Sequence, residues 1–152
     1  MRLTAVQGAR DRCAIVAAMV KDFPHNSAVT HVVREMLRAA AHKTINIEGI
    51  RNRFHVSYAS EAAKPFLHIG GAVISDHCVP LSLLVQRVLR ERIADVDLLV
   101  NLAAQYSAMA LITVEEDNRL SSFKLRKSMP PDWDGQDKLA RYKAIGINMV
   151  PV

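Results

Sequence analysis

The sequence predicts an α+β fold that is mostly helical and forms a single domain. Apolar residues recur at helical spacing through much of the chain, as Val29, Val33 and Leu37 do. Two short apolar runs, at residues 72–74 and 108–112, have the length of strands. The second run passes directly into a segment that carries a helix-capping pattern. With 152 residues, half of them apolar, the chain is long enough for one domain with a hydrophobic core.

The amino-terminal segments are predicted to be helical. Residues 9–20 are expected to form a first helix, and the segment 22–26, which contains a proline, breaks the chain after it. Ser27 is a suitable N-cap for a second helix, because the apolar stripe begins directly after it. A further short helix is expected at residues 57–63, ended by Pro65.

The central part is predicted to alternate strand and helix. The apolar run 72–74 follows two glycines and is expected to be a strand that delivers Asp76 and His77 at its end. Between residues 80 and 106, leucines and valines at helical spacing predict two helices, separated near residues 94–95. These helices interrupt the path between the two strands.

A capping box marks the start of the next helix. Thr113 and Glu116 follow the expected strand 108–112. In a capping box, the Thr113 hydroxyl accepts a hydrogen bond from the helix backbone, and the Glu116 side chain accepts one from the Thr113 backbone N–H. A helix is therefore predicted to start at Val114, with Asn118 in its second turn.

The rest of the chain is predicted to be a turn and a last helix. Residues 132–135 form the expected turn, and the helix 136–145 is ended by Gly146. The expected organisation is one domain over residues 1–152 with three parts. These are a helical amino-terminal part (1–69), a core with a helical insertion (70–128) and a carboxy-terminal turn and helix (129–152).

Charge and cysteine content narrow the class of protein. The net charge of +5 favours an anionic partner, and nucleic acid is the commonest partner of a small basic domain. Cys13 and Cys78 lie far apart and form no metal-binding pair, so neither a disulfide framework nor a zinc knuckle is predicted. The two unpaired cysteines favour a reducing cytoplasm. We expect no membrane segment, because no apolar run approaches the roughly 18 residues that a span requires.

The most informative motif is Asp-His-Cys-Val-Pro-Leu-Ser at residues 76–82. Asp76 offers a hard oxygen ligand for Mg²⁺ or Mn²⁺. His77, next to it, is the side chain type best suited to take a proton from attacking water at neutral pH. Asn118 is a candidate metal ligand through its amide oxygen, or a brace for the histidine segment through its amide group. We interpret these residues as a site that cuts phosphodiester bonds.

The motif at 76–82, followed by a strand and a capped helix with Asn118, resembles the HNH (ββα-metal) nuclease family. The resemblance extends over residues 70–128 and is greatest to the Asp-His-Asn branch found in CRISPR effector nucleases. It implies a strand, strand, helix core, with Asp76 and Asn118 as ligands of a single Mg²⁺ or Mn²⁺ ion and His77 as the general base. It also implies a hydrolase that cuts DNA, with RNA left open as a substrate.

The resemblance further implies a biological setting and partners. Small HNH proteins of this kind resemble effector subunits of bacterial antiviral defence or mobile-element systems, where a larger protein partner gates them. Four basic residues of the last segment are candidate contacts to the phosphates of nucleic acid. They are Arg119, Lys124, Arg126 and Lys127.

A hypothesis of a different class accounts for the same residues. The chain would be a non-catalytic basic module that binds nucleic acid or a protein partner, and the Asp76-His77 turn would be structural. Cys78 is expected to be a buried packing residue rather than a nucleophile. Metal binding that depends on Asp76 distinguishes the two hypotheses, because a structural turn should be indifferent to metal. The oligomeric state is not predicted.

Overall fold

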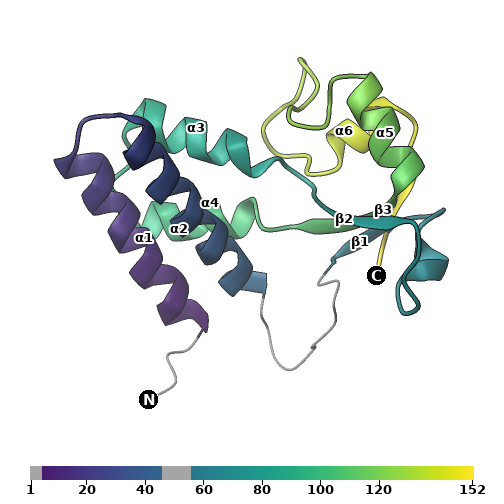
Figure 1. Ribbon diagram of the computed structural model, residues 1–152, viewed down its shortest axis with the longest axis horizontal. Coiled ribbons are helices and arrows are strands. Elements are labelled where there is room, and N and C mark those ends of the chain that lie inside the picture. The colour runs from purple at the N-terminus through teal and green to yellow at the C-terminus, as the bar shows by residue number, and fades with distance from the viewer. Residues whose placement is uncertain (1–4, 46–55) are drawn as a thin grey trace. The chain divides into compact units, whose positions relative to one another are not determined.

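The chain has a mixed α+β fold, which confirms the predicted class (Figure 1). A computed structural model of the protein describes residues 5–45 and 56–152. The chain divides into two compact units. A helical unit is formed by the stretches 1–50 and 81–107, and a sheet unit by the stretches 51–80 and 108–152.

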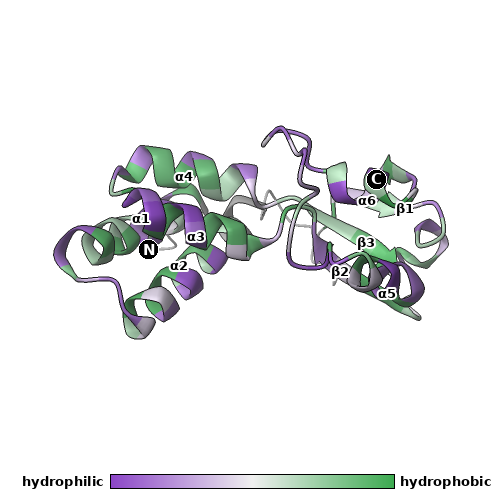
Figure 2. Cartoon of the chain, turned by 90° about the horizontal axis from the view of Figure 1, so that it is seen from above, coloured by the Kyte–Doolittle hydropathy of each residue, from purple (hydrophilic) through white to green (hydrophobic). Residues whose placement is uncertain are grey.

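The described part of the helical unit contains four helices, which are α1 (Ala5–Asp22), α2 (Ser27–Ile45), α3 (Leu81–Glu91) and α4 (Val96–Gln105). Helices α1 and α2 pack against each other and against α4, and α3 packs against α2. These helices carry both apolar and polar residues, and α4 is largely apolar (Figure 2). The core of the unit includes Cys13, Val33, Leu37, Leu84 and Leu99, all of them fully buried. The predicted insertion therefore completes a helical core with the amino-terminal helices.

The ends of these helices follow local sequence signals. The Asp95 side chain accepts a hydrogen bond from the Leu98 N–H (3.0 Å) and so caps α4 at the predicted break. At α2 the Asn26 side chain accepts from the Val29 N–H (2.9 Å), whereas Ser27 is the first helical residue. The cap of α2 is therefore Asn26 and not the predicted Ser27.

In its described residues, the sheet unit contains four short strands, two helices and one 3₁₀ turn. The elements are β1 (Tyr58–Ser60), η1 (Lys64–Phe66), β2 (Val73–His77), β3 (Met109–Thr113), α5 (Val114–Ser122), α6 (Ala140–Ala144) and β4 (Met149–Pro151). The strand order is β2-β3-β1-β4. Strand β2 pairs antiparallel with β3, β3 pairs parallel with β1, and β1 pairs antiparallel with β4. Strand β2 is therefore an outer strand of this sheet.

Each face of the sheet has its own apolar layer. On one face, Ala110 and Ile112 of β3 pack with Leu120 of α5 and with Tyr142 of α6. On the other face, Leu111 packs with residues around η1. Helices α5 and α6 therefore lie on the same face, and the segment containing η1 lies on the opposite one (Figure 1).

Most predicted elements of the sheet unit are present, with three differences. The helix predicted at 57–63 is wrong, because Tyr58 and Ala59 pair with β3 and form a strand. Pro65 lies within the short 3₁₀ turn that follows, where its missing N–H costs nothing. Strand β4 was not predicted. The last helix is limited to α6, and Gly146, with φ of +71°, follows it.

Both cysteines are free and buried, as expected for packing residues. Burial raises the pKa of the Cys13 thiol to about 11 and that of the Cys78 thiol to about 12. Because only the thiolate attacks a disulfide reagent, we expect neither thiol of the folded protein to react with a chromogenic aromatic disulfide at pH 8. Both should react at once in guanidinium chloride. If the native protein rapidly released one equivalent of the aromatic thiolate from the reagent, the burial of these residues would be contradicted.

Among the described residues, none of the helices combines the length and the apolar character that a membrane crossing requires.

Candidate functional site

Asp76 and His77 are the last two residues of the outer strand β2. Asp76 is paired with Ala110 and His77 with Met109. Successive side chains of a strand point to opposite faces of the sheet. Ile74, two residues before Asp76, packs in the same layer as Ala110, so Asp76 is directed toward the face of α5 and α6. His77 is directed toward the opposite face.

The Asp76 carboxylate is held by two neighbouring residues of α6. Its Oδ2 accepts from Nη2 of Arg141 (2.5 Å) and from the hydroxyl of Tyr142 (2.7 Å). The Arg141 side chain is completely buried, whereas 18% of the Asp76 side chain remains exposed. None of the described residues donates to the second oxygen of Asp76, Oδ1. One carboxylate oxygen is therefore anchored, and the other has no partner in the described part of the chain.

Arg141 joins three segments of the sheet unit. Its Nε donates to the Cys78 carbonyl (3.1 Å), and its Nη2 also donates to the His77 carbonyl. Its Nη1 donates to the carbonyls of Leu125 (3.0 Å) and Arg126 (2.9 Å). The end of β2 and the loop after α5 are thus tied to α6 by one guanidinium group.

Tyr142 remains a hydrogen-bond donor to Asp76 at any physiological pH. Burial raises the pKa of its phenol far above the ordinary value, and the negative charge of Asp76 raises it further. Arg141 and Tyr142 are site residues that the sequence did not reveal. The only signal was the apolar spacing of Leu139, Tyr142 and Ile145, and that spacing does not indicate that the intervening arginine is buried.

Helix α5 begins with the predicted capping box. The Thr113 hydroxyl accepts from the Glu116 N–H (3.1 Å), and Glu116 accepts from the Thr113 N–H (2.9 Å). The same Glu116 oxygen accepts from the hydroxyl of buried Ser60 of β1 (2.6 Å). The cap thereby fixes α5 to the sheet as well as starting it.

Asn118 lies on the exposed side of α5. The adjacent Asp117 is only 6% exposed and forms an ion pair with Arg126 (3.3 Å). No hydrogen bond in the described residues joins Asn118 to Asp76. Arg141 therefore binds the Asp76 carboxylate and the His77 backbone carbonyl, while the His77 side chain is directed to the other face. Asn118 lies on the neighbouring helix, with no hydrogen bond to Asp76 among the described residues.

The four basic residues predicted to contact phosphates differ in their surroundings. Arg119 donates to the carbonyl of Ile145 at the end of α6, and Arg126 is paired with Asp117. Lys124 and Lys127 are exposed. Two of the four cations are therefore engaged within the sheet unit, and the two lysines face solvent.

A metal ion at this site would rely on few protein ligands. The described residues contain no group of three or more histidine, cysteine or acidic side chains positioned to hold a metal ion. Mg²⁺ commonly binds through one or two carboxylates and keeps several waters, and substrate phosphates complete its shell. A single anchored carboxylate such as Asp76 suits this mode of binding and does not suit a protein cage.

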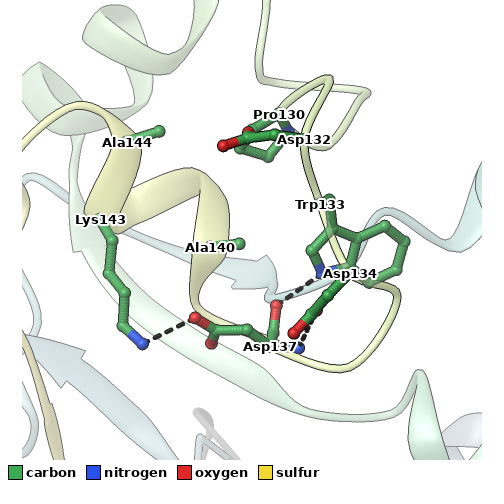
Figure 3. A pocket seen from close by; sticks show the side chains of 8 residues that line it. All are labelled: Pro130, Asp132, Trp133, Asp134, Asp137, Ala140, Lys143 and Ala144. Atoms are coloured by element: carbon green, nitrogen blue, oxygen red, sulfur yellow. Dashed lines mark hydrogen bonds and ion pairs between the residues drawn. The ribbon is translucent and has the colours of Figure 1, made fainter.

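The sheet unit also contains a surface pocket of about 410 Å³ around the predicted turn (Figure 3). The Trp133 indole N–H donates to the Asp137 carbonyl (2.8 Å), and the Asp137 carboxylate pairs with Lys143 (2.7 Å). Asp134 accepts from the backbone N–H groups of residues 136 and 137, which lowers its pKa. These groups stabilise one another, so the pocket is accounted for by the aromatic turn that the sequence predicted.

The chain matches no family model, no curated protein and no solved structure. Its function therefore has to be inferred from the residues themselves.

Proposed function

We propose that this protein is a metal-dependent endonuclease similar to HNH enzymes, which hydrolyses phosphodiester bonds in DNA, with RNA as an alternative substrate. The observation that carries the proposal is the arrangement of β2, β3 and α5. Strand β2 ends in Asp76 and His77 and pairs antiparallel with β3, and α5 begins at the residue after β3. This is the strand, strand, helix order that the resemblance to HNH nucleases implies.

The anchoring of Asp76 supports a role as a metal ligand. Carboxylates that bind metals are usually oriented by hydrogen bonds to their other oxygen. Arg141 and Tyr142 provide such bonds to Oδ2, and Oδ1 is the oxygen that would bind Mg²⁺ or Mn²⁺. Asn118 would add an amide oxygen or brace the segment that carries the histidine.

In the proposed reaction, His77 accepts the proton of a water molecule as the water oxygen attacks phosphorus. The bond to the 3′ oxygen breaks, and this oxygen leaves with the electron pair. A bound divalent ion would neutralise charge on the phosphate and the leaving oxygen. Asp76 and His77 point to opposite faces, so the phosphate would have to reach both side chains around the outer edge of β2.

Replacing His77 with alanine is expected to lower the rate of cleavage by about 10² to 10⁴, the contribution of a general base. The measurement is the nicking and linearisation of supercoiled plasmid in Mg²⁺, Mn²⁺ or EDTA. His68→Ala is the matched control, because His68 is an exposed histidine of the same unit. Equal cleavage by the His77 and His68 variants would refute the role of the base.

A second function is favoured by the burial of Arg141. A buried guanidinium needs a counter-ion, and Asp76 serves as one, which is a sufficient structural reason for this carboxylate. The chain would then be a non-catalytic basic module that binds nucleic acid or a protein. Binding of Mn²⁺ to the wild type and to Asp76→Asn separates the two functions. A nuclease site should bind Mn²⁺ in the wild type and lose this binding in Asp76→Asn. For a structural carboxylate, the substitution should not change Mn²⁺ binding.

Such a nuclease could serve as the effector subunit of a bacterial defence or mobile-element system. A larger protein partner would then control its activity. Cleavage that appears only in cell extract or with a co-purified protein would identify such gating. Cleavage by the purified chain would show that it acts without a partner.

A further inference from the structure

The helical unit contains a cavity of about 610 Å³ that the proposed nuclease site does not use. It is lined by residues of α2 and α3 and of the turn before α2. Val85, which is 2% exposed, and Leu89 give it an apolar wall. The volume is in the range of ligand pockets for small organic molecules.

The charges at this cavity all have the same sign. Arg34 of α2 and Arg90 of α3 line it, and none of the residues that line it is acidic. Arg34 has no ion pair or hydrogen bond to any side chain that the structure describes. Among the described residues, Arg90 forms an ion pair with the adjacent Glu91 (3.4 Å), and both of these side chains are well exposed. Both guanidinium groups line the same cavity, so an anion bound there could pair with both of them.

Other hydrogen-bonding side chains accompany the two arginines. The Thr30 hydroxyl donates to the Asn26 carbonyl (2.9 Å) and lies 3.1 Å from Nε2 of His25. Because the hydroxyl hydrogen is used, Nε2 has to donate to Thr30, which fixes the imidazole at the cavity. The Ser82 hydroxyl and the Gln86 amide add further donors to the lining. An apolar wall, polar side chains in the lining and two guanidinium groups suit a ligand with an anionic head and an apolar or planar body.

We propose that this cavity binds a phosphate ester of nucleotide size, with Arg34 and Arg90 on the phosphate and the base or another planar body against Val85 and Leu89. Arginine binds phosphate oxygens through paired hydrogen bonds. Inorganic phosphate could form these bonds but would lack the contacts of a planar body with Val85 and Leu89. The same chemistry is present in a free nucleotide and in one nucleotide of a nucleic acid strand. This site goes beyond the proposed nuclease activity and does not depend on it.

The test is a calorimetric titration of the full chain with three ligands in turn, which are AMP, inorganic phosphate and a single-stranded oligonucleotide. Arg34→Gln is the test variant and Arg38→Gln the matched control. Arg38 is exposed one turn further along α2, contacts only Glu35 (4.0 Å) and does not line the cavity. Arg34→Gln should raise the dissociation constant about tenfold, which corresponds to the loss of a charge-assisted hydrogen bond, and Arg38→Gln should change it less than about twofold.

The outcomes separate the sources of the phosphate. Binding of AMP that Arg34→Gln weakens identifies a free nucleotide as ligand. Binding of the oligonucleotide alone, with the same sensitivity, identifies a strand. The proposal is overturned if neither probe binds, or if the Arg34 and Arg38 variants bind equally well. Plasmid cleavage is measured in parallel, and its loss in His77→Ala with unchanged AMP binding shows that the two sites are independent.

Discussion

Replacing Arg141 with methionine is expected to lower the free energy of unfolding by about 3 to 5 kcal/mol, the cost of breaking a buried ion pair by removing one partner. The variant leaves the Asp76 carboxylate without its cation and four backbone carbonyls without their donor. Methionine fills a similar volume, so the loss reports on charge and hydrogen bonds and not on a cavity. The measurement is denaturation in guanidinium chloride followed by circular dichroism.

Lys143→Met is the matched control for this experiment. Lys143 lies two residues later in α6, is exposed and pairs with Asp137, so its loss should cost about 0 to 1 kcal/mol. The double variant Arg141→Met with Asp76→Asn should be more stable than Arg141→Met alone, because it removes the unpaired buried charge. A loss below about 1 kcal/mol for Arg141→Met would show that the guanidinium does not hold the unit together.

Local signals predicted the helices and the site strand. The capping box of Thr113 and Glu116 involves residues three apart, so its hydrogen bonds are readable from sequence, and α5 begins where it predicts. The apolar run before Asp76 likewise predicted β2, because it is bounded by glycines. At the start of α2 two neighbouring residues, Asn26 and Ser27, are both good caps, and propensity did not decide between them.

The missed elements depend on contacts between distant segments. Strands β1 and β4 have three residues each, and they exist because β1 pairs with β3 and β4 pairs with β1. Segments of three residues carry too little sequence pattern to exclude a helix. The short helix predicted at 57–63 is wrong for this reason. Tertiary pairing overrode a weak local preference.

The candidate site was predicted in part. Asp76 and His77 lie at the end of β2, as the motif indicated. The partners of Asp76 lie 65 and 66 residues away, in Arg141 and Tyr142, and no motif links the two segments. Their role follows from burial, because a fully buried guanidinium needs an acidic partner and many acceptors. Sequence spacing contains no information on that burial.

Leu120 and Asn118 of α5 provide the last test, which separates the stability of the helix from the chemistry of the site. Leu120 is fully buried in the apolar layer over β3, so Leu120→Ala should lower the free energy of unfolding by about 2 to 5 kcal/mol. Asn118 is exposed, and Asn118→Ala should change the stability by less than about 0.5 kcal/mol. Both values come from the same denaturation experiment.

Because Asn118→Ala is expected to leave the fold intact, any loss of Mn²⁺ binding or of plasmid cleavage in this variant can be assigned to the site. A loss with unchanged stability would support Asn118 as ligand or brace. Unchanged binding, unchanged cleavage and unchanged stability would exclude it from the site, and the metal would then rest on Asp76, water and phosphate. A large loss of stability would contradict the exposed position of Asn118, since an exposed side chain with no side-chain contact contributes little to folding.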